Sequence, residues 1–99
     1  GLLGLTRSLA AEHSPDKILV NALCPGWVDT EMAQEGLQGF ADVLNVSKEE
    51  AYKEAMKPVP LGKMSKPEEV AQLVAYLISE EQTSFTGQTL DINNGALMP

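Results

Sequence analysis

The stretch Ile18-Leu19-Val20-Asn21-Ala22-Leu23, followed by Cys24-Pro25-Gly26, predicts a buried β-strand with a sharp end. Apolar side chains would lie on both faces of this strand, which is typical of a parallel strand covered by helices above and below. The strand should end at Pro25-Gly26, because proline lacks a backbone N–H and glycine favours a turn. In open α/β sheets, ligands bind just beyond the carboxyl ends of the strands. The segment from Cys24 to Met32 is therefore where we expect a binding site.

Residues 1–12 precede this strand and carry leucines at the i, i+3 and i+7 spacing of an amphipathic helix. The helix should end near His13-Ser14-Pro15, because proline disfavours helical geometry in the residue before it. Since the helical pattern begins at once and Gly1 stands in place of Met, we expect the chain to start inside a structural element of a longer protein.

Beyond the strand, Thr30 can cap a short helix over Glu31 to Glu35 that stops at Gly36, and residues 36–46 are expected to be irregular. Ser47-Lys48-Glu49-Glu50 matches a capping box and predicts a helix that stops at Pro58. A second capping box, Ser65-Lys66-Pro67-Glu68, begins the clearest amphipathic helix. Its apolar stripe consists of Val70, Leu73, Val74, Leu77 and Ile78.

A last short strand over residues 87–92 ends at Asn93-Asn94-Gly95. The order helix, strand, long excursion, helix, strand predicts an α/β fold in which the two strands are parallel. Two strands do not make a stable sheet alone, so the pattern calls for further strands and helices. We therefore expect residues 1–99 to be part of one domain, with an excursion over about residues 31–60.

Composition excludes several classes of function. The formal net charge is −7, from 14 acidic and 7 basic residues, which argues against a nucleic-acid partner. No apolar run reaches the roughly 20 residues that a membrane span needs. A single cysteine, Cys24, rules out an internal disulfide and favours a reducing compartment, so a cytoplasmic location is expected. With one histidine, His13, and no clustered acids, no metal site is predicted.

Four separated segments resemble the carboxyl-terminal part of the short-chain dehydrogenase/reductase family, and the likeness covers about residues 1–96. The segments are Gly1 to Glu12, residues 20–30, Pro60 to Ala71, and Phe85-Thr86-Gly87-Gln88-Thr89-Leu90. The resemblance implies a Rossmann-like doubly wound parallel sheet and an NAD or NADP cofactor. Within the family, the motifs are most similar to 3-oxoacyl and polyketide ketoreductases. Asn93-Asn94-Gly95 departs from the Asp-Gly-Gly that is more usual there.

The resemblance assigns the cofactor site to Pro25, Gly26, Val28 and Thr30. At the position of Val28 the family's backbone hydrogen-bonds the nicotinamide carboxamide, and the hydroxyl at the position of Thr30 supports the same group or a phosphate. The alternative is a plain turn in which Thr30 only caps a helix, and the two roles can coexist because a hydroxyl both donates and accepts.

Trp27 and Met32 fall in the family's variable substrate-binding region, and the excursion over about residues 31–60 corresponds to its substrate lid. Phe40, Tyr52 and Met56 either line an apolar pocket there or only pack the short helices. Cys24 and His13 are expected to be a packing residue and a surface residue.

No catalytic residue can be assigned. Neither tyrosine begins a Tyr-x-x-x-Lys motif, since Met56 follows Tyr52 and Glu80 follows Tyr76 at that spacing, and no glycine fingerprint for dinucleotides occurs. The resemblance implies that the complete protein interconverts a carbonyl and a secondary alcohol, while this chain alone should be inactive.

The expected partners are a small-molecule carbonyl or alcohol substrate and other copies of the complete subunit, as a homodimer or homotetramer. A different class of function remains open, namely a non-catalytic oligomerisation or interaction module.

Overall fold

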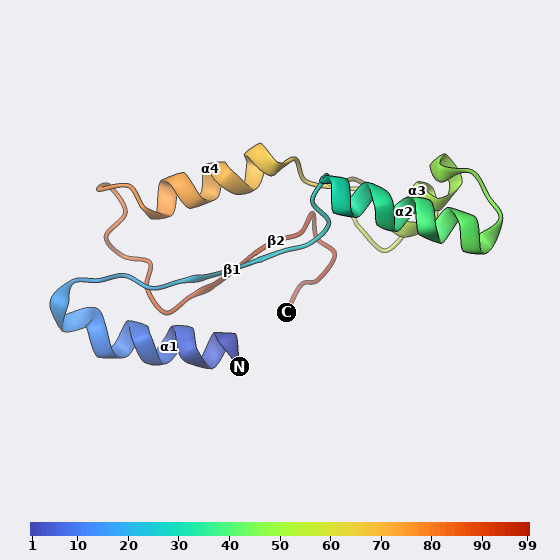
Figure 1. Ribbon diagram of the computed structural model, residues 1–99. Helices are drawn as coiled ribbons and strands as arrows, with labels where there is room; N and C mark the ends of the chain where they lie inside the picture. Colours follow the sequence, from blue (N-terminus) through green and yellow to red (C-terminus); the bar gives the residue numbers. More distant parts are fainter.

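The computed structural model describes residues 1–99 and has seven elements. In chain order they are α1 (Leu2–His13), the 3-10 helix η1 (Ser14–Asp16), β1 (Ala22–Pro25), α2 (Glu31–Leu44), α3 (Lys48–Met56), α4 (Pro67–Leu77) and β2 (Thr89–Ile92). The two strands pair in parallel, with Ala22 opposite Thr89 and Pro25 opposite Ile92. α1 and α4 lie on opposite sides of the strand pair, and α2 and α3 lie together beyond one end of it (Figure 1). The predicted α/β class and parallel pairing are confirmed.

β1 begins four residues later than the sequence pattern predicted, at Ala22, and it includes Pro25. The preceding residues lie against a turn and not against a strand, because Gly87 has a φ of +70°. The Gly87 N–H donates to the Val20 carbonyl (2.7 Å), and the Asn21 side chain accepts from the Gln88 N–H (3.1 Å). The regular hydrogen bonding between β1 and β2 therefore starts only beyond the left-handed Gly87.

The expectation of an irregular segment over residues 36–46 is wrong, because α2 continues through Gly36 and Gly39 to Leu44. Each glycine costs a helix interior about 1 kcal/mol relative to alanine. That cost is offset because Leu37 and Ala41, one turn apart, are almost completely buried. The helix stops at Asn45, whose φ of 56° is left-handed, and not at Gly36.

A small core joins α2, α3 and the connector that follows them. It consists of Leu37, Met56, Val59 and Met64. Ser47 begins α3 as predicted, with its Oγ accepting from the Glu50 N–H (3.1 Å). Met56 therefore packs in the core, which answers one of the alternatives left open by the sequence. The excursion is a helical hairpin with its own packing, in place of a loose loop.

The N-cap of α4 lies one residue later in the sequence than predicted. Lys66 is the N-cap residue, and its N–H donates to Glu69 Oε1 (3.0 Å), which lowers the pKa of the Glu69 carboxyl group. Ser65, predicted as the cap, is instead buried and paired with residues far away in the sequence. No residue of α4 is fully buried. In its apolar stripe, Val70, Leu73 and Leu77 are half-buried, while Val74 and Ile78 are exposed.

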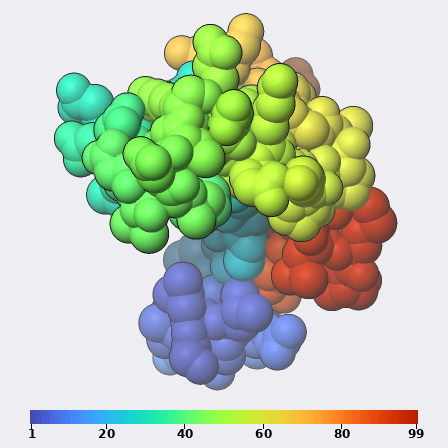
Figure 2. Space-filling view, turned by 90° about the vertical axis from the view of Figure 1, so that its right-hand side faces the viewer, coloured from blue at the N-terminus to red at the C-terminus, as the bar shows by residue number.

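The chain exposes far more surface than a compact protein of its mass. Its radius of gyration is 17.0 Å, against about 13 Å for a compact domain of this length. The accessible surface is 6997 Å², roughly 1,500 Å² above the expectation for a folded monomer. Only 11 of 99 residues are buried, and α1 stands apart from α2 and α3 in the space-filling view (Figure 2). Apolar side chains of α1 and α4 are therefore exposed to solvent in the isolated chain.

No helix of the structure has both the length and the hydropathy that crossing a membrane requires.

Candidate functional site

The carboxyl end of β1 is fixed by a close approach to the end of β2. The Gly26 N–H donates to the Ile92 carbonyl (3.1 Å). A Cβ placed on Gly26 would lie 2.8 Å from the Asn93 Cβ, closer than real Cβ atoms approach, and 3.1 Å from the Asn93 Cα, which is a tight contact. Packing therefore favours glycine at this position, and the residue that approaches it is Asn93. Pro25 precedes this contact as the last residue of β1.

Val28 lies in a short extended segment that is hydrogen-bonded along one edge only. It forms an isolated parallel bridge with Ser65, in which the Ser65 N–H donates to the Trp27 carbonyl (2.9 Å) and the Asp29 N–H donates to the Ser65 carbonyl (2.8 Å). In extended backbone, a residue's own N–H and C=O point to the edge opposite to those neighbouring groups. Neither group of Val28 has a hydrogen-bond partner within the chain. Val28 thus presents a free donor and a free acceptor side by side.

Thr30 is the N-cap of α2, with extended backbone and its Oγ1 accepting from the Ala33 N–H (3.2 Å). The hydroxyl proton of Thr30 has no acceptor within the chain and is free to donate to a ligand. Gln34 steadies the same turn, because its Nε2 donates to Asp29 Oδ1 (2.8 Å). The predicted capping role of Thr30 is confirmed, and the role toward a cofactor remains compatible with it.

An apolar groove of about 280 Å³ opens between Trp27 and the helical hairpin. Its lining residues are Trp27, Gly36, Leu37, Phe40 and Ala55. The Trp27 side chain is only partly covered, at 38% exposure, so it forms one wall of an open groove. Met32, predicted beside it as a substrate contact, is 81% exposed on the first turn of α2 and is not part of this lining.

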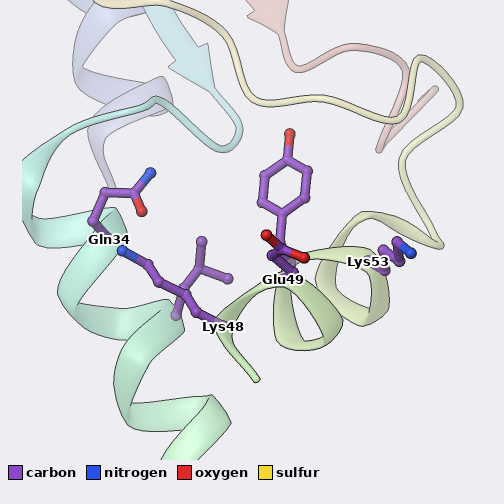
Figure 3. Close-up of a pocket in the computed structure, with 6 residues that line it drawn as sticks. Gln34, Lys48, Glu49 and Lys53 are labelled. Carbon is purple, nitrogen blue, oxygen red and sulfur yellow. The ribbon is translucent and has the colours of Figure 1, made fainter. Parts of the chain in front are cut away.

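A second and more open groove separates α2 from α3 (Figure 3). It has a volume of about 420 Å³ and is lined by Gln34, Leu37, Lys48, Glu49, Tyr52 and Lys53. Leu37 borders both grooves. Tyr52 packs partly against the hairpin core, as one of its two alternatives predicted. The groove that it also lines is bordered mostly by polar and charged residues, and Tyr52 does not line the apolar groove.

The other side chains that could take part in chemistry, those of Cys24 and His13, are not grouped with further reactive residues into a site. No group of three or more His, Cys, Asp and Glu residues is placed to hold a metal ion. Cys24 is a free, partly covered thiol in β1 opposite Asp91. His13 lies 3.6 Å from Asp16 at the end of α1, far along the chain from the Val28 loop.

Sequence reasoning missed two polar residues that support this site, Ser65 and Asn94. Ser65 was interpreted as a helix cap, yet it is 2% exposed and forms the bridge to Val28. Asn94 donates from Nδ2 to the Lys63 carbonyl (3.0 Å) and to Ser65 Oγ (3.1 Å). The available signal was the departure of Asn93-Asn94-Gly95 from the Asp-Gly-Gly pattern, because an asparagine can adopt a left-handed turn and also bond sideways.

Comparison with known proteins gives one consistent family. Residues 1–96 match the family described as Enoyl-(Acyl carrier protein) reductase. The chain is 42% identical over 95 residues to the Monensin polyketide synthase putative ketoacyl reductase of Streptomyces virginiae, covering 96% of this chain and 36% of that protein. It is 40% identical over 95 residues to the 3-oxoacyl-(acyl-carrier-protein) reductase of Aquifex aeolicus, covering 96% of this chain and 34% of that protein. The chain thus spans about a third of the length of these curated relatives.

Solved structures agree on the fold. A short chain dehydrogenase family protein from Francisella tularensis matches with a TM-score of 0.91 and 35% identity, over 96% of this chain and 39% of that one. An actinorhodin polyketide ketoreductase with NADPH matches with a TM-score of 0.86 and 41% identity, over 97% of this chain and 37% of that one.

Proposed function

The chain belongs to the short-chain dehydrogenase/reductase family, and from that membership we propose that it is part of an NAD(P)-dependent oxidoreductase. The complete protein interconverts a carbonyl and a secondary alcohol, with 3-oxoacyl or polyketide compounds as the substrate class. Relatives that carry those names and a structural neighbour solved with NADPH support this proposal. Since the chain spans about a third of those relatives, the activity is proposed for the complete protein.

The observation that carries the proposal is the pair of free backbone groups on Val28. A primary carboxamide, such as that of nicotinamide, offers one carbonyl acceptor and an NH₂ donor. The free N–H and C=O of Val28 match both of these at once. When bound, the cofactor supplies or accepts the hydride. Val28 orients the carboxamide, Thr30 donates its free hydroxyl proton, and Pro25 and Gly26 hold the loop at the end of β1.

The apolar groove between Trp27 and the helical hairpin is proposed to hold the substrate. Trp27 and Phe40 form two of its walls, and the absence of a side chain at Gly36 keeps it wide. No polar side chain lines it, which suits the hydrocarbon part of a 3-oxoacyl chain or an aromatic polyketide. Met32, exposed at the first turn of α2, is proposed to contact substrate only when the lid closes.

The tyrosine and lysine that catalyse the reaction in this family are not among residues 1–99, where no Tyr-x-x-x-Lys occurs. This chain is proposed to supply the nicotinamide loop, the substrate lid and part of the surface between subunits. The exposed leucines of α1, with Leu2 and Leu5 more than half exposed, and the exposed Ile78 at the C-cap of α4 suit a homodimer or homotetramer.

Replacing Thr30 by valine in the complete subunit is expected to weaken NAD(P)H binding several-fold, up to about tenfold. The substitution keeps the shape and removes a hydroxyl whose hydrogen bond to an uncharged group contributes about 0.5–1.5 kcal/mol. Because the same hydroxyl caps α2, the melting temperature should fall too, by the equivalent of about 1 kcal/mol. The measurements are a fluorescence titration with NAD(P)H and a thermal melt.

The control is Ser47→Ala, which removes the corresponding cap of α3 at a distance from the loop. Ser47→Ala should lower the melting temperature by a similar amount and leave the NAD(P)H dissociation constant unchanged. If Thr30→Val behaves like this control, Thr30 is a cap alone.

A further inference from the structure

The turn after β2 contacts the segment that pairs with Val28 through the side chain of Asn94. Asn94 Nδ2 donates to the Lys63 carbonyl (3.0 Å) and to Ser65 Oγ (3.1 Å). The backbone carbonyl of Asn94 accepts from the Leu61 N–H (3.1 Å). Ser65 is 2% exposed, so its contact with Asn94 is shielded from water. We name the pair of side chains the Ser65–Asn94 clasp.

The clasp acts on the loop through the backbone of Ser65. That backbone accepts from the Asp29 N–H (2.8 Å) and donates to the Trp27 carbonyl (2.9 Å), so it sets the peptide planes on both sides of Val28. A rotation of either plane would turn the free N–H or C=O of Val28 away from its ligand. The orientation of the Val28 donor and acceptor therefore depends on where Ser65 is held.

The conformation of Asn94 indicates what its side chain adds. Its φ is 53°, in the left-handed region where glycine is unstrained. Glycine would thus satisfy the backbone of this turn at least as well as asparagine. What asparagine supplies in addition is the carboxamide, and both acceptors of that carboxamide lie in the segment that carries Ser65.

We propose that Asn94 and Ser65 are positioning residues for the cofactor, which orient the backbone of Val28 without touching the cofactor themselves. The inference rests on the proposed function of Val28. It predicts that cofactor affinity is sensitive to a side chain on the far side of the loop, and that the binding of the carbonyl substrate is less sensitive to it.

The decisive variant is Asn94→Gly in the complete subunit, which keeps the left-handed turn and removes both hydrogen bonds. The dissociation constant and the KM for NAD(P)H should rise by about two- to tenfold, in line with the loss of one or two hydrogen bonds between uncharged groups. The KM for the carbonyl substrate should change less than the KM for NAD(P)H. Ser65→Ala should shift NAD(P)H affinity in the same direction, and the double variant should be weaker by less than the sum of the two effects.

Asn45→Gly is the matched control. Asn45 also has a left-handed φ, 56°, at the end of α2, and its side chain makes no hydrogen bond within the chain. Asn45→Gly makes the same exchange at a left-handed position and leaves the Ser65–Asn94 clasp intact. The affinity for NAD(P)H should therefore not change.

If the unchanged protein binds NAD(P)H, any one of three results would overturn the proposal. One is a lowered melting temperature of Asn94→Gly with unaltered affinity, another is an equal loss of affinity in Asn45→Gly, and the third is full additivity of Ser65→Ala and Asn94→Gly. If Asn94→Gly does not fold, unaltered affinity in Ser65→Ala overturns it in the same way. If the unchanged protein fails to bind NAD(P)H, the proposed function itself is wrong, and this inference falls with it.

Discussion

The 99-residue chain, purified by itself, is expected to show no reductase turnover with NAD(P)H and no cooperative thermal transition. Turnover should be absent because the chain contains neither a Tyr-x-x-x-Lys motif nor a glycine fingerprint for dinucleotides. Cooperative folding should be absent because a two-stranded sheet is marginal at best and only 11 of 99 residues are buried. The expected signal is a broad, sloping melt by circular dichroism and a flat trace at the absorbance of the reduced nicotinamide.

The complete subunit serves as the positive control in both assays, where it should turn over substrate and melt cooperatively. A sharp, reversible transition of the isolated chain at a monomeric mass would contradict this account, since it would mean that the open faces of α1 and α4 need no cover. Turnover by the isolated chain would contradict the assignment of chemistry to residues outside it.

Gly26→Ala is expected to destabilise the complete subunit by about 1–3 kcal/mol, the usual cost of forcing an extra carbon into a filled space. The added Cβ would lie 2.8 Å from the Asn93 Cβ and 3.1 Å from the Asn93 Cα. A backbone atom cannot swing aside as the end of a side chain can, so the ends of β1 and β2 must separate. Thermal melts should show the loss, at about 2–4 °C per kcal/mol for a domain of 150–250 residues.

Gly39→Ala provides the matched control, because Gly39 lies on the exposed surface of α2 and a Cβ there meets nothing within 4 Å. This substitution should raise stability by about 0.5–1 kcal/mol through the higher helix propensity of alanine. If Gly26→Ala were as stable as the unchanged protein, the close contact between Gly26 and Asn93 would not be a feature of the folded molecule.

The sequence pattern predicted the elements whose local signals agree with their packing. α1, α3 and β2 lie close to where leucine spacing, a capping residue and a glycine turn placed them. The position of Thr30 before a helical pattern predicted the cap that the structure shows, whereas its role toward a cofactor came from the family resemblance and stays a prediction. The parallel pairing followed from apolar residues on both faces of the first strand.

The errors arose where long-range contacts outweighed local preference. Gly36 predicts a helix end locally, but the burial of Leu37 and Ala41 continues α2 past it. Ser65 has the local signature of a cap, yet the bridge to Val28 and the bond from Asn94 place it in the interior. Neither partner of Ser65 lies within 25 residues of it in the sequence, so no local pattern could reveal the clasp.

The most direct test of the nicotinamide role of this chain is the hydrogen exchange of the Val28 amide in the complete subunit, with and without NAD(P)H. In the free protein this N–H has no partner and should exchange quickly. With cofactor at 100 times its dissociation constant, exchange should slow by about a hundredfold, because the bound state occupies all but about 1% of the molecules. The Asp29 amide, already bonded to Ser65, should change less. If NAD(P)H binds and the Val28 amide exchanges as quickly as before, Val28 does not hold the carboxamide and the central claim is wrong.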